Sequence, residues 1–582
     1  MAGWRQRLAE TARRNRVELV NSGLTRRDLL QLGLLTSTGY LVTKLGLSTR
    51  AAGAGGAPKS PATTPWVEEL PVPPIASAVD VASLGTTPRQ ELDLASGERG
   101  RSTPHQHWGL YDPAAADHYL IENRVTLTSW HRELPLDPCW CFNGTFPGPR
   151  IHARHGRPVL VRFRNQLPGL DQHVGYGRPT PSTHVHGGHN ASESDGHPLD
   201  TIEPGTFKDH LLLNRRAGFT DPAYGLGGDP RETLTTLWYH DHCLGFSAQN
   251  VYRGNVGLYH LFNESDTGDE NDPSPTAWRL PSGEFDVPLV LHDRVFDPDG
   301  KGFFDLFDLD GILGDTFTVN GKIQPFLRVA RRKYRFRALN AGPSRCYDCS
   351  LSNQQSLVQL TRDGNLLPLP LTVDHVRLAV GDRVDVIVDF SRLPSGTRLY
   401  LVNCCAQADG RGPTGRPRPP ALGQKLLQFV VDGSLDTKGD PSRVPDRFFD
   451  LPPVDPGDVA TERTFVFDRT SGGWGVNGKP FDPDLIMARP RSGTAEIWNF
   501  VNNSSRWAYA VHVPLEAHQV LAWNGQAPAA DDAAREDAVW LGPGDSVKTF
   551  RRFRDFVGRY VTHGRDLVHS DHALMFQWKV EP

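Results

Sequence analysis

The sequence is poor in sulfur and has no strong excess of charge. Its 582 residues include 7 cysteines and 3 methionines, and the formal net charge is −4. So few cysteines do not form a disulfide framework in a chain of this length, and 3 methionines argue against a methionine-rich metal-handling surface. Basic residues (63) and acidic residues (67) are well mixed, so no basic stripe or tail points to nucleic acid. At about 150 residues per unit, this length predicts three or four structural units.

Four of the cysteines occur as two close pairs. Cys404 and Cys405 are adjacent and cannot easily bridge to each other, while Cys346 and Cys349 lie near another predicted strand. One structural disulfide remains an open alternative, and buried free thiols are the favoured interpretation.

Long apolar runs are also scarce. A moderately apolar stretch at 29–47 is interrupted by threonines and Lys44, which makes it too polar and too broken for a membrane span. It follows the paired Arg26 and Arg27 and precedes small residues at 51–54, where a signal peptidase can cut. This pattern resembles a twin-arginine export signal, and a chance arginine pair in a basic helix is the alternative.

We therefore expect residues 1–55 to be a signal region that the twin-arginine translocation machinery recognises. The exported protein would be periplasmic, in the cell envelope or extracellular, with no stable membrane span after processing. Residues 56–116 would form a linker and N-terminal extension. The part from 56 to 100 is rich in proline, alanine, serine and glycine, which predicts a mobile linker.

From about residue 117 onward, short alternating runs are separated by turn residues. Glycine (57) and proline (47) are frequent, which favours turn-rich β structure, and no long amphipathic helix stands out. Strands with a period of two are predicted at 159–164, 237–242, 289–292, 334–339, 383–389, 495–500 and 559–562. Many short strands at regular spacing predict an all-β protein built from Greek-key sandwiches.

A weak internal repeat divides this β region into three. An Asn-Gly dipeptide recurs near the start of each unit, at 143–144, 320–321 and 477–478. The repeat predicts three domains, at 117–270, 271–440 and 441–582.

The 22 histidines are unevenly distributed. His184 and His186 form one H-x-H pair in the first predicted domain, and His240 and His242 form another. Residues i and i+2 of a strand project to the same face, so each pair presents two imidazoles side by side. Imidazole binds copper, zinc, iron and nickel, so two such pairs in one domain indicate a transition-metal site without naming the metal. Hydrogen-bonded structural histidines are the alternative.

Longer motifs resemble the multicopper oxidases, in particular the bacterial branch with spore-coat laccases, bilirubin oxidases and phenoxazinone synthases. The similarity extends over nearly all of residues 117–582. It rests on Asn143-Gly-Thr-Phe-Pro-Gly-Pro149, His184–Pro198 with Ser194-Asp195-Gly196, Leu237-Trp-Tyr-His-Asp-His242, Gly314-Asp-Thr316 with Val319-Asn-Gly-Lys322, and Arg332-Lys-Tyr-Arg-Phe-Arg337. The resemblance implies three cupredoxin-like domains, a trinuclear copper cluster between the first and third, and a type 1 copper in the third that collects electrons from substrate.

The third domain departs from the family's H-P-x-H-x-H element. With Gln519-Val-Leu521 as the anchor, this chain has Tyr509 at the type 1 histidine position and His512 at the type 2 position. Pro514 stands at a type 3 position.

The last family element, H-C-H-x-x-x-H with an axial methionine or leucine, is altered as well. Here it reads His563-Gly564-Arg565-Asp-Leu-Val-His569, with Leu574 at the axial position. Gly564 replaces the cysteine, and Arg565 replaces a type 3 histidine. A type 1 site needs a thiolate and two imidazoles, and of these three ligands His569 alone remains. We therefore predict no type 1 copper and no ordinary laccase turnover.

Six of the eight histidines that the resemblance implies for the trinuclear cluster are present. They stand two to a former copper position: His184 and His512, His186 and His240, and His242 and His563. We predict that these six hold copper, in fewer than four ions. Arg565 places a permanent cation at a ligand position, which disfavours two metal ions beside it unless an anion or carboxylate intervenes.

Three further residues are candidates for catalysis: Asp195, Arg565 and Glu516. Asp195 matches an acidic residue that in relatives sits by the type 2 copper and helps to move protons, and Arg565 would steer an anionic group of a substrate. Glu516 shares the strand parity of His512, and with His518 it is a candidate replacement ligand; pairing with Arg565 or another base is the alternative. Structural roles are favoured for His189, His197, His569 and His572.

Three functions compete. The first is an exported copper-dependent oxidoreductase with a reduced histidine-rich centre, acting on an unidentified small molecule, with dioxygen as a candidate co-substrate. The second is a copper-free exported scaffold of the same fold with a cell-envelope or cell-division role, which the missing cysteine favours and the six histidines disfavour. The third is a zinc or other redox-inert site for hydrolysis, for which no nucleophile motif is visible.

Overall fold

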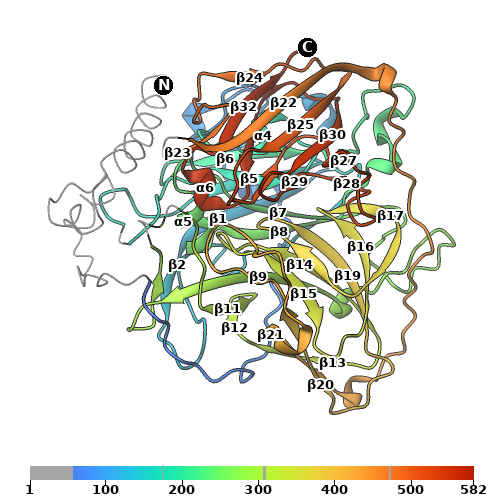
Figure 1. Ribbon diagram of the computed structural model, residues 1–582. Coiled ribbons are helices and arrows are strands. Elements are labelled where there is room, and N and C mark those ends of the chain that lie inside the picture. The colour runs from blue at the N-terminus through green and yellow to red at the C-terminus, as the bar shows by residue number, and fades with distance from the viewer. Residues whose placement is uncertain (1–56, 174, 306–307, 309, 471–472) are drawn as a thin grey trace.

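The structure is a computed structural model that describes residues 57–582, apart from 174, 306–307, 309 and 471–472 (Figure 1). The predicted signal region at 1–55 lies outside the described residues. Within them the protein is almost entirely β, with six sheets that form three pairs. The predicted all-β class is confirmed.

The first unit contains two four-stranded sheets, with the orders β2-β1-β4-β6 and β3-β8-β7-β5. Its strands are β1 (Asp117–Thr128), β2 (Asp137–Phe142), β3 (Ile151–Arg154), β4 (Val159–Asn165), β5 (Thr183–His186), β6 (Phe207–Leu212), β7 (Thr236–Asp241) and β8 (Val256–Phe262). Two short helices, α4 (Ser192–Asp195) and α5 (Ser247–Arg253), connect them.

The second unit contains the sheets β12-β11-β9-β14-β19-β16-β17, with β10 paired to β9, and β13-β21-β20-β15-β18. Its strands are β9 (Asp286–Phe296), β10 (Gly302–Phe303), β11 (Thr316–Val319), β12 (Lys322–Ile323), β13 (Phe326–Val329), β14 (Lys333–Asn340), β15 (Tyr347–Leu351), β16 (Leu357–Arg362), β17 (Asn365–Val373), β18 (Val376–Leu378), β19 (Arg383–Asp389), β20 (Arg398–Asn403) and β21 (Gln424–Val431). This unit occupies the lower right of Figure 1.

The third unit contains the sheets β23-β22-β25-β30-β27-β28 and β24-β32-β31-β26-β29, and lies at the top of Figure 1. Its strands are β22 (Val459–Thr470), β23 (Gly473–Val476), β24 (Ile486–Ala488), β25 (Thr494–Asn502), β26 (Tyr509–His512), β27 (His518–Trp523), β28 (Arg535–Glu536), β29 (Ala538–Leu541), β30 (Ser546–Phe553), β31 (Gly558–Gly564) and β32 (Met575–Val580). Helix α6 (Leu567–Asp571) follows β31.

The seven predicted strands are confirmed, with one residue of disagreement. The predicted 383–389 coincides with β19, and the predicted 237–242 extends one residue beyond β7. Strand β25 shows why the pattern is informative, because its residues alternate between buried and partly exposed positions along most of its length.

The Asn-Gly repeat marks the same turn in all three units. Asn143, Asn320 and Asn477 each have φ between 48° and 51°, and the glycine after each also has positive φ. Asparagine and glycine tolerate this left-handed conformation better than other residues. The Oδ1 atom of each asparagine accepts a backbone N–H from an early strand of its own unit, at 2.7–2.8 Å. The sequence repeat therefore has a structural cause.

Residues 57–100 do not form the mobile linker that their composition predicts. Leu84 is fully buried, and isolated β-bridges join Glu69, Ile75 and Glu98 to the first two units. The segment buries apolar side chains and pairs its backbone with the first two units, so it packs along them although its composition is typical of a loop.

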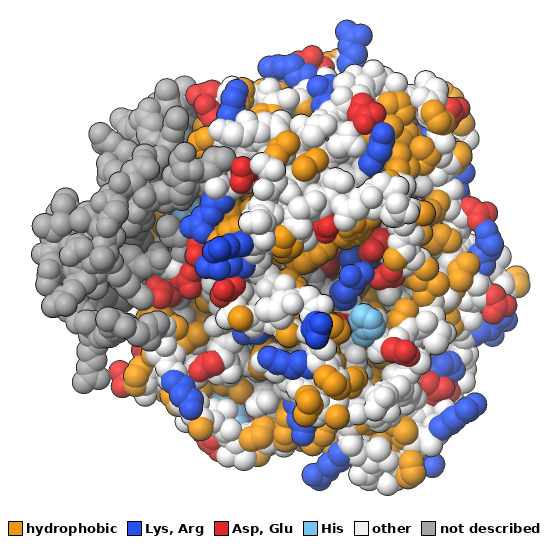
Figure 2. All heavy atoms as spheres, in the orientation of Figure 1, with side chains coloured by type: hydrophobic (Ala, Val, Ile, Leu, Met, Phe, Trp, Pro, Cys, Tyr) orange, Lys and Arg blue, Asp and Glu red, His pale blue; other side chains and the backbone are white. Residues whose placement is uncertain are grey.

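All seven cysteines are buried and free, as predicted. Among the described residues, no helix is long and apolar enough to cross a membrane. Figure 2 shows basic and acidic side chains interspersed on the visible face, in agreement with the mixed charge of the sequence.

Candidate metal centre

The two H-x-H pairs of the first unit lie on neighbouring strands. His184 and His186 belong to β5, and His240 belongs to β7, with His242 directly after it. The strands are antiparallel, with His184 opposite His240. Strand periodicity therefore directs these rings toward one region, as the sequence predicts.

Two histidines of the third unit meet them there. His512 on β26 is opposite His563 on β31. The His184 ring centroid lies 5.5 Å from that of His512 and 6.4 Å from that of His563. His186 stacks on His512 at 3.8 Å, and His242 lies 4.4 Å from His563. The six predicted ligands are all buried and lie together at the boundary between the first and third units.

Backbone carbonyls fix the orientation of three rings. The Nδ1 atoms of His184, His512 and His563 each lie 2.6–3.0 Å from a carbonyl oxygen. A carbonyl only accepts, so this network assigns the proton to Nδ1 and leaves a lone pair on Nε2. The three Nε2 atoms have no hydrogen-bond partner within the described part of the chain. We call these residues the orphan trio.

The orphan trio fits a metal ion. One ring nitrogen from each residue lies within 4.8 Å of the other two. Three buried acceptors without a donor need a partner, and a carbonyl on the opposite ring nitrogen is the usual support of a metal-bound histidine.

Burial keeps His512 and His563 neutral. Desolvation lowers the pKa of His512 to about 4, although Asp537 opposes the shift. Desolvation also holds the pKa of His563 well below its usual value, and the charges of neighbouring histidines add to this effect. A neutral imidazole is the form that binds metal.

His186 and His240 are engaged in a different way. His240 Nδ1 lies 2.8 Å from the carbonyl oxygen of Asp241, which assigns its proton to Nδ1. His240 Nε2 then accepts from His186 Nδ1 at 3.3 Å, and His186 Nε2 accepts from Arg565 Nη2 at 3.2 Å. Ring nitrogens of His184, His186 and His240 also lie within 4.8 Å of one another. However, every nitrogen of His186 and His240 already has a partner, and we call these two residues the closed pair.

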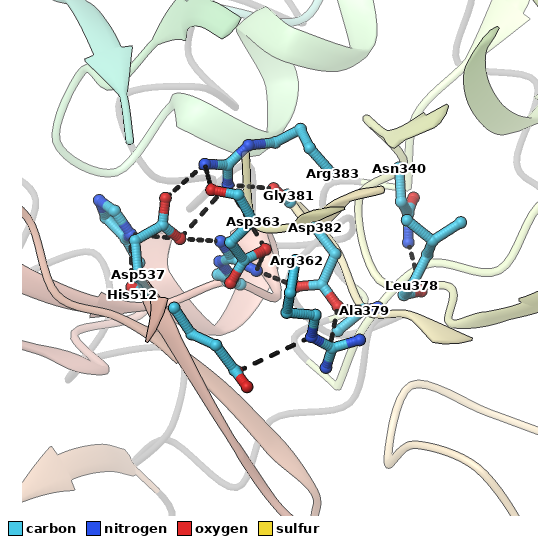
Figure 3. Close-up of polar contacts among 12 residues, drawn as sticks. Asn340, Arg362, Asp363, Leu378, Ala379, Gly381, Asp382, Arg383, His512 and Asp537 are labelled. Carbon is cyan, nitrogen blue, oxygen red and sulfur yellow. Dashed lines mark hydrogen bonds and ion pairs between the residues drawn. The ribbon is translucent and has the colours of Figure 1, made fainter. Parts of the chain in front are cut away.

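Arg565 is held by carboxylates from two units. Its Nη2 lies 2.5 Å from Asp537 Oδ1, while its Nη1 pairs with Asp382 and lies 3.4 Å from Asp363 Oδ1. Arg383 also pairs with Asp537. Figure 3 shows Arg383 of the second unit pointing toward Asp537 of the third, with Asp363 and Asp382 on the second-unit side of the same cluster. Arg565 is therefore neutralised inside the protein and is not free to steer a substrate anion.

Asp195 is brought to the centre. It ends α4, its carbonyl oxygen anchors His184, and its Oδ2 lies 3.5 Å from His184 Nδ1. Its Oδ1 has no hydrogen-bond partner among the described residues.

Glu516 does not face the histidines. Arg554 binds its carboxylate at 2.6 and 2.9 Å, so the structure shows pairing with another base. Contrary to the prediction, Glu516 and His512 do not project to the same face of one strand. Strand β26 ends at His512, and Leu515 has a φ of 78°, which turns the chain. Glu516 groups instead with His189 and Asp555.

His518, the other candidate replacement ligand, begins β27 and is fully buried. Neither of its ring nitrogens has a hydrogen-bond partner among the described residues. Desolvation and the charge of Arg551 hold its pKa well below the usual value. His518 belongs to none of the metal-capable groups found in the described residues.

The positions that the resemblance assigns to type 1 copper are filled by packing. A β-carbon on Gly564 would lie 2.9 Å from Leu574 Cδ2. His569 packs at 4.2 Å on Trp474 and at 6.5 Å from Tyr509, between ring centroids. Its Nε2 is hydrogen-bonded to the carbonyl oxygen of Asp310 at 2.9 Å.

The remaining histidines expected to be structural also have hydrogen bonds. His189 Nε2 lies 2.9 Å from Asp555 Oδ2, and His197 Nε2 lies 2.8 Å from Gln577 Oε1. His572 Nδ1 lies 2.5 Å from a backbone carbonyl oxygen.

Sequence reasoning missed the carboxylates around Arg565. Asp363 lies in the turn between β16 and β17, Asp382 directly before β19, and Asp537 between β28 and β29. No motif or spacing marks these positions, since only the packing of the second unit against the third brings them together.

Comparisons with known proteins agree with this architecture. A family model described as multicopper oxidase matches residues 125–217. A laccase of Bacillus subtilis (strain 168) is 30% identical over 492 residues, which are 76% of this chain and 90% of the relative. The bilirubin oxidase of Albifimbria verrucaria is 30% identical over 448 residues, 75% of this chain and 71% of the relative. The crystal structure of a laccase from Pediococcus acidilactici has a similar fold, with a TM-score of 0.70 at 20% identity, covering 92% of this chain and 97% of that one.

Proposed function

Since the chain belongs to the multicopper oxidase family, we propose that it is a copper-dependent oxidoreductase with a reduced histidine centre and no type 1 copper. The centre lies between the first and third units. Its substrate is a small molecule that reaches the centre directly, because no second copper site remains to receive electrons at a distance.

The orphan trio is the observation that carries this proposal. His184, His512 and His563 would hold copper through their Nε2 atoms, which are buried and have no hydrogen-bond partner in the described chain. Three imidazoles are a suitable ligand set for copper. When bound, copper supplies one-electron redox chemistry.

The absence of a type 1 copper is supported by both composition and packing. No cysteine follows Cys405 in the sequence, so the third unit has no thiolate to offer. Leu574 lies where a side chain on Gly564 would extend. A trigonal site of one thiolate and two imidazoles therefore lacks its defining ligand.

Asp195 is the proposed proton handler. Its Oδ1 has no hydrogen-bond partner among the described residues, while its backbone carbonyl holds His184 in place. The same residue thus positions a ligand and carries a carboxylate oxygen without a hydrogen-bond partner beside His184, which we propose as the proton acceptor.

Metal counting tests the proposal. The full-length protein is saturated with Cu²⁺, freed of loosely bound ions by gel filtration and analysed for metal and protein. We expect about one copper ion per chain, no intense blue charge-transfer band, and loss of the ion in His184→Ala. Zero metal in the folded protein, or zinc without copper after growth with both metals, would overturn the proposal.

A copper-free exported scaffold is the second candidate. The closed pair favours it, because His186, His240 and Arg565 complete one another's hydrogen bonds without any ion. Folded protein that binds no metal at any Cu²⁺ concentration would support this function. A hydrolytic enzyme is the third candidate, and zinc bound in place of copper would support it.

We also propose export by the twin-arginine route, on the basis of Arg26 and Arg27 ahead of the apolar stretch. A reporter fused to residues 1–55 should be exported in cells with the translocase. Replacing both arginines by lysine should abolish export, and a reporter that is exported without the translocase would contradict this route.

A further inference from the structure

One nitrogen of Arg565 lies between two atoms that can bind metal. Ring nitrogens of His186 and His512 and a carboxylate oxygen of Asp537 lie within 4.8 Å of one another. Arg565 Nη2 is 3.2 Å from His186 Nε2 and 2.5 Å from Asp537 Oδ1. The same charged nitrogen therefore contacts two members of this group.

We propose that His186 and Asp537, bordered by His512, form a second site for a divalent first-row metal ion, and that Arg565 is its built-in occupant. The guanidinium is a permanent cation. It donates a hydrogen bond to the lone pair on His186 Nε2 and neutralises the carboxylate of Asp537. A divalent ion cannot share that space with it, so Arg565 restricts the centre to the single ion of the orphan trio.

The ligand types agree with this assignment. The Nε2 atom of His186 and a carboxylate oxygen of Asp537 suit iron, zinc and copper, and copper binds most tightly in the divalent series. His512 borders this site and does not ligate in it, because its Nδ1 proton is donated to the Asp537 carbonyl and its Nε2 belongs to the orphan trio. Asp537 Oδ1 lies 3.4 Å from His512 Nδ1 and 3.8 Å from His186 Nε2, so the carboxylate is already among the imidazoles. Only the guanidinium of Arg565 would have to move out of the site before a metal ion could bind there.

The surrounding charges explain why Arg565 stays. Its other nitrogen is bound by Asp382, and Asp363 lies 3.4 Å away. Three carboxylates thus surround Arg565, and Arg383 is the other cation that pairs with Asp537. Without Arg565, Asp537 keeps Arg383 and Asp382 keeps Arg362 at 4.0 Å, and a metal ion on His186 and Asp537 would supply the positive charge that is lost.

The network also reaches toward the protein surface. Asp382 and Arg362 line a cavity of about 850 Å³ between the second and third units. Cations in the solvent therefore have a route to the outer end of the cluster that holds Arg565.

The experiment compares removal of the charge with its retention. Arg565→Met removes the cation with a side chain of similar length, and Arg565→Lys keeps a cation as the matched control. Apo protein is titrated with Cu²⁺, and the ions per chain are counted by native mass spectrometry and by elemental analysis. We expect one more ion per chain in Arg565→Met than in the wild type, no gain in Arg565→Lys, and no gain in Arg565→Met/Asp537→Asn.

An Arg565→Met protein that folds and binds no more copper than the wild type would overturn the inference. So would an extra ion that persists in the Asp537→Asn double variant. If Arg565→Met does not fold, Arg565→Met/Asp382→Asn also removes the charge of the carboxylate outside the site that has lost Arg565 and keeps only Arg362, at 4.0 Å. Its count is judged in the same way.

The inference rests on the proposed function only for the wild-type count of one ion. Zero ions in the wild type and one in Arg565→Met would refute the proposed function and support the second site. One ion in both would support the proposed function and refute the second site.

Discussion

The two sides of the histidine centre have diverged to different extents. The first unit keeps both H-x-H pairs, on β5 and β7. The third unit keeps His512 and His563, but it has Tyr509, Pro514, Gly564 and Arg565 where the family resemblance places ligands. The two units contribute neighbouring strands to one buried region, so the difference arises from side chains and not from the fold.

The altered side is well packed, which indicates adaptation of the site. Leu574 fills the space beside Gly564, and Tyr509 lies among aromatic rings. The carbonyl oxygen of Pro514 accepts a hydrogen bond from Arg551 at 2.8 Å. Arg565 donates to His186 Nε2 and thereby satisfies the last free nitrogen of the closed pair. The side chains at these positions thus have contacts of their own, while the three Nε2 atoms of the orphan trio lie close together without a hydrogen-bond partner among the described residues.

The largest expected effect comes from removing a ligand on the third-unit side. His512→Ala should reduce the copper content from about one ion per chain to none, because two imidazoles without a third ligand hold copper weakly. His240→Gln is the matched control. The His240 ring is buried at the same centre but both its nitrogens have partners, so we expect its copper content to be unchanged.

Elemental analysis and circular dichroism of the two variants check this contrast. Loss of copper from folded His240→Gln would show that the closed pair binds metal. The distinction between the orphan trio and the closed pair would then be wrong.

A smaller effect is expected from restoring the missing cysteine. Gly564→Cys should destabilise the protein by about 1–3 kcal/mol because the new side chain overpacks against Leu574. Gly564→Ala should cost nearly as much, since the β-carbon causes the clash. No blue absorption band should appear with Cu²⁺, because Tyr509 supplies no imidazole and His569 Nε2 is already hydrogen-bonded.

Thermal denaturation and visible spectra test this second prediction. Gly564→Cys/Leu574→Ala should relieve the clash, as a matched check that packing is the cause. An intense blue band in Gly564→Cys would mean that the third unit can still assemble a type 1 site.

Local patterns explain why so much of the centre could be predicted. Alternation in strands and the H-x-H pairs depend on neighbouring residues, so the strands and four of the clustered histidines follow from local patterns. His512 and His563 were expected only from the family resemblance. Glu516 was assigned wrongly to the face of His512 because the parity rule assumes a continuous strand, and Leu515 interrupts it with a φ of 78°. The partners of Arg565 could not be predicted, because Asp363, Asp382 and Asp537 approach it only when separate units pack together.

The smallest expected effect is that of mild acid on copper binding. Burial lowers the pKa of His512 to about 4, against about 6.5 for a histidine in the unfolded chain. Protons therefore compete with metal at this ring only near pH 4, and copper content should not change between pH 7 and about pH 5.5.

The unfolded chain binds more protons than the folded one between these two pKa values, so the free energy of unfolding of the apo protein falls as pH drops from about 6.5 to about 4. This ring contributes at most about 3 kcal/mol to that fall. Copper counted after equilibration at each pH, with denaturant unfolding of the apo protein in parallel, measures both quantities. Half-release of copper near pH 6.5 would mean that the binding imidazoles are exposed to solvent, and the buried orphan trio would not be the site.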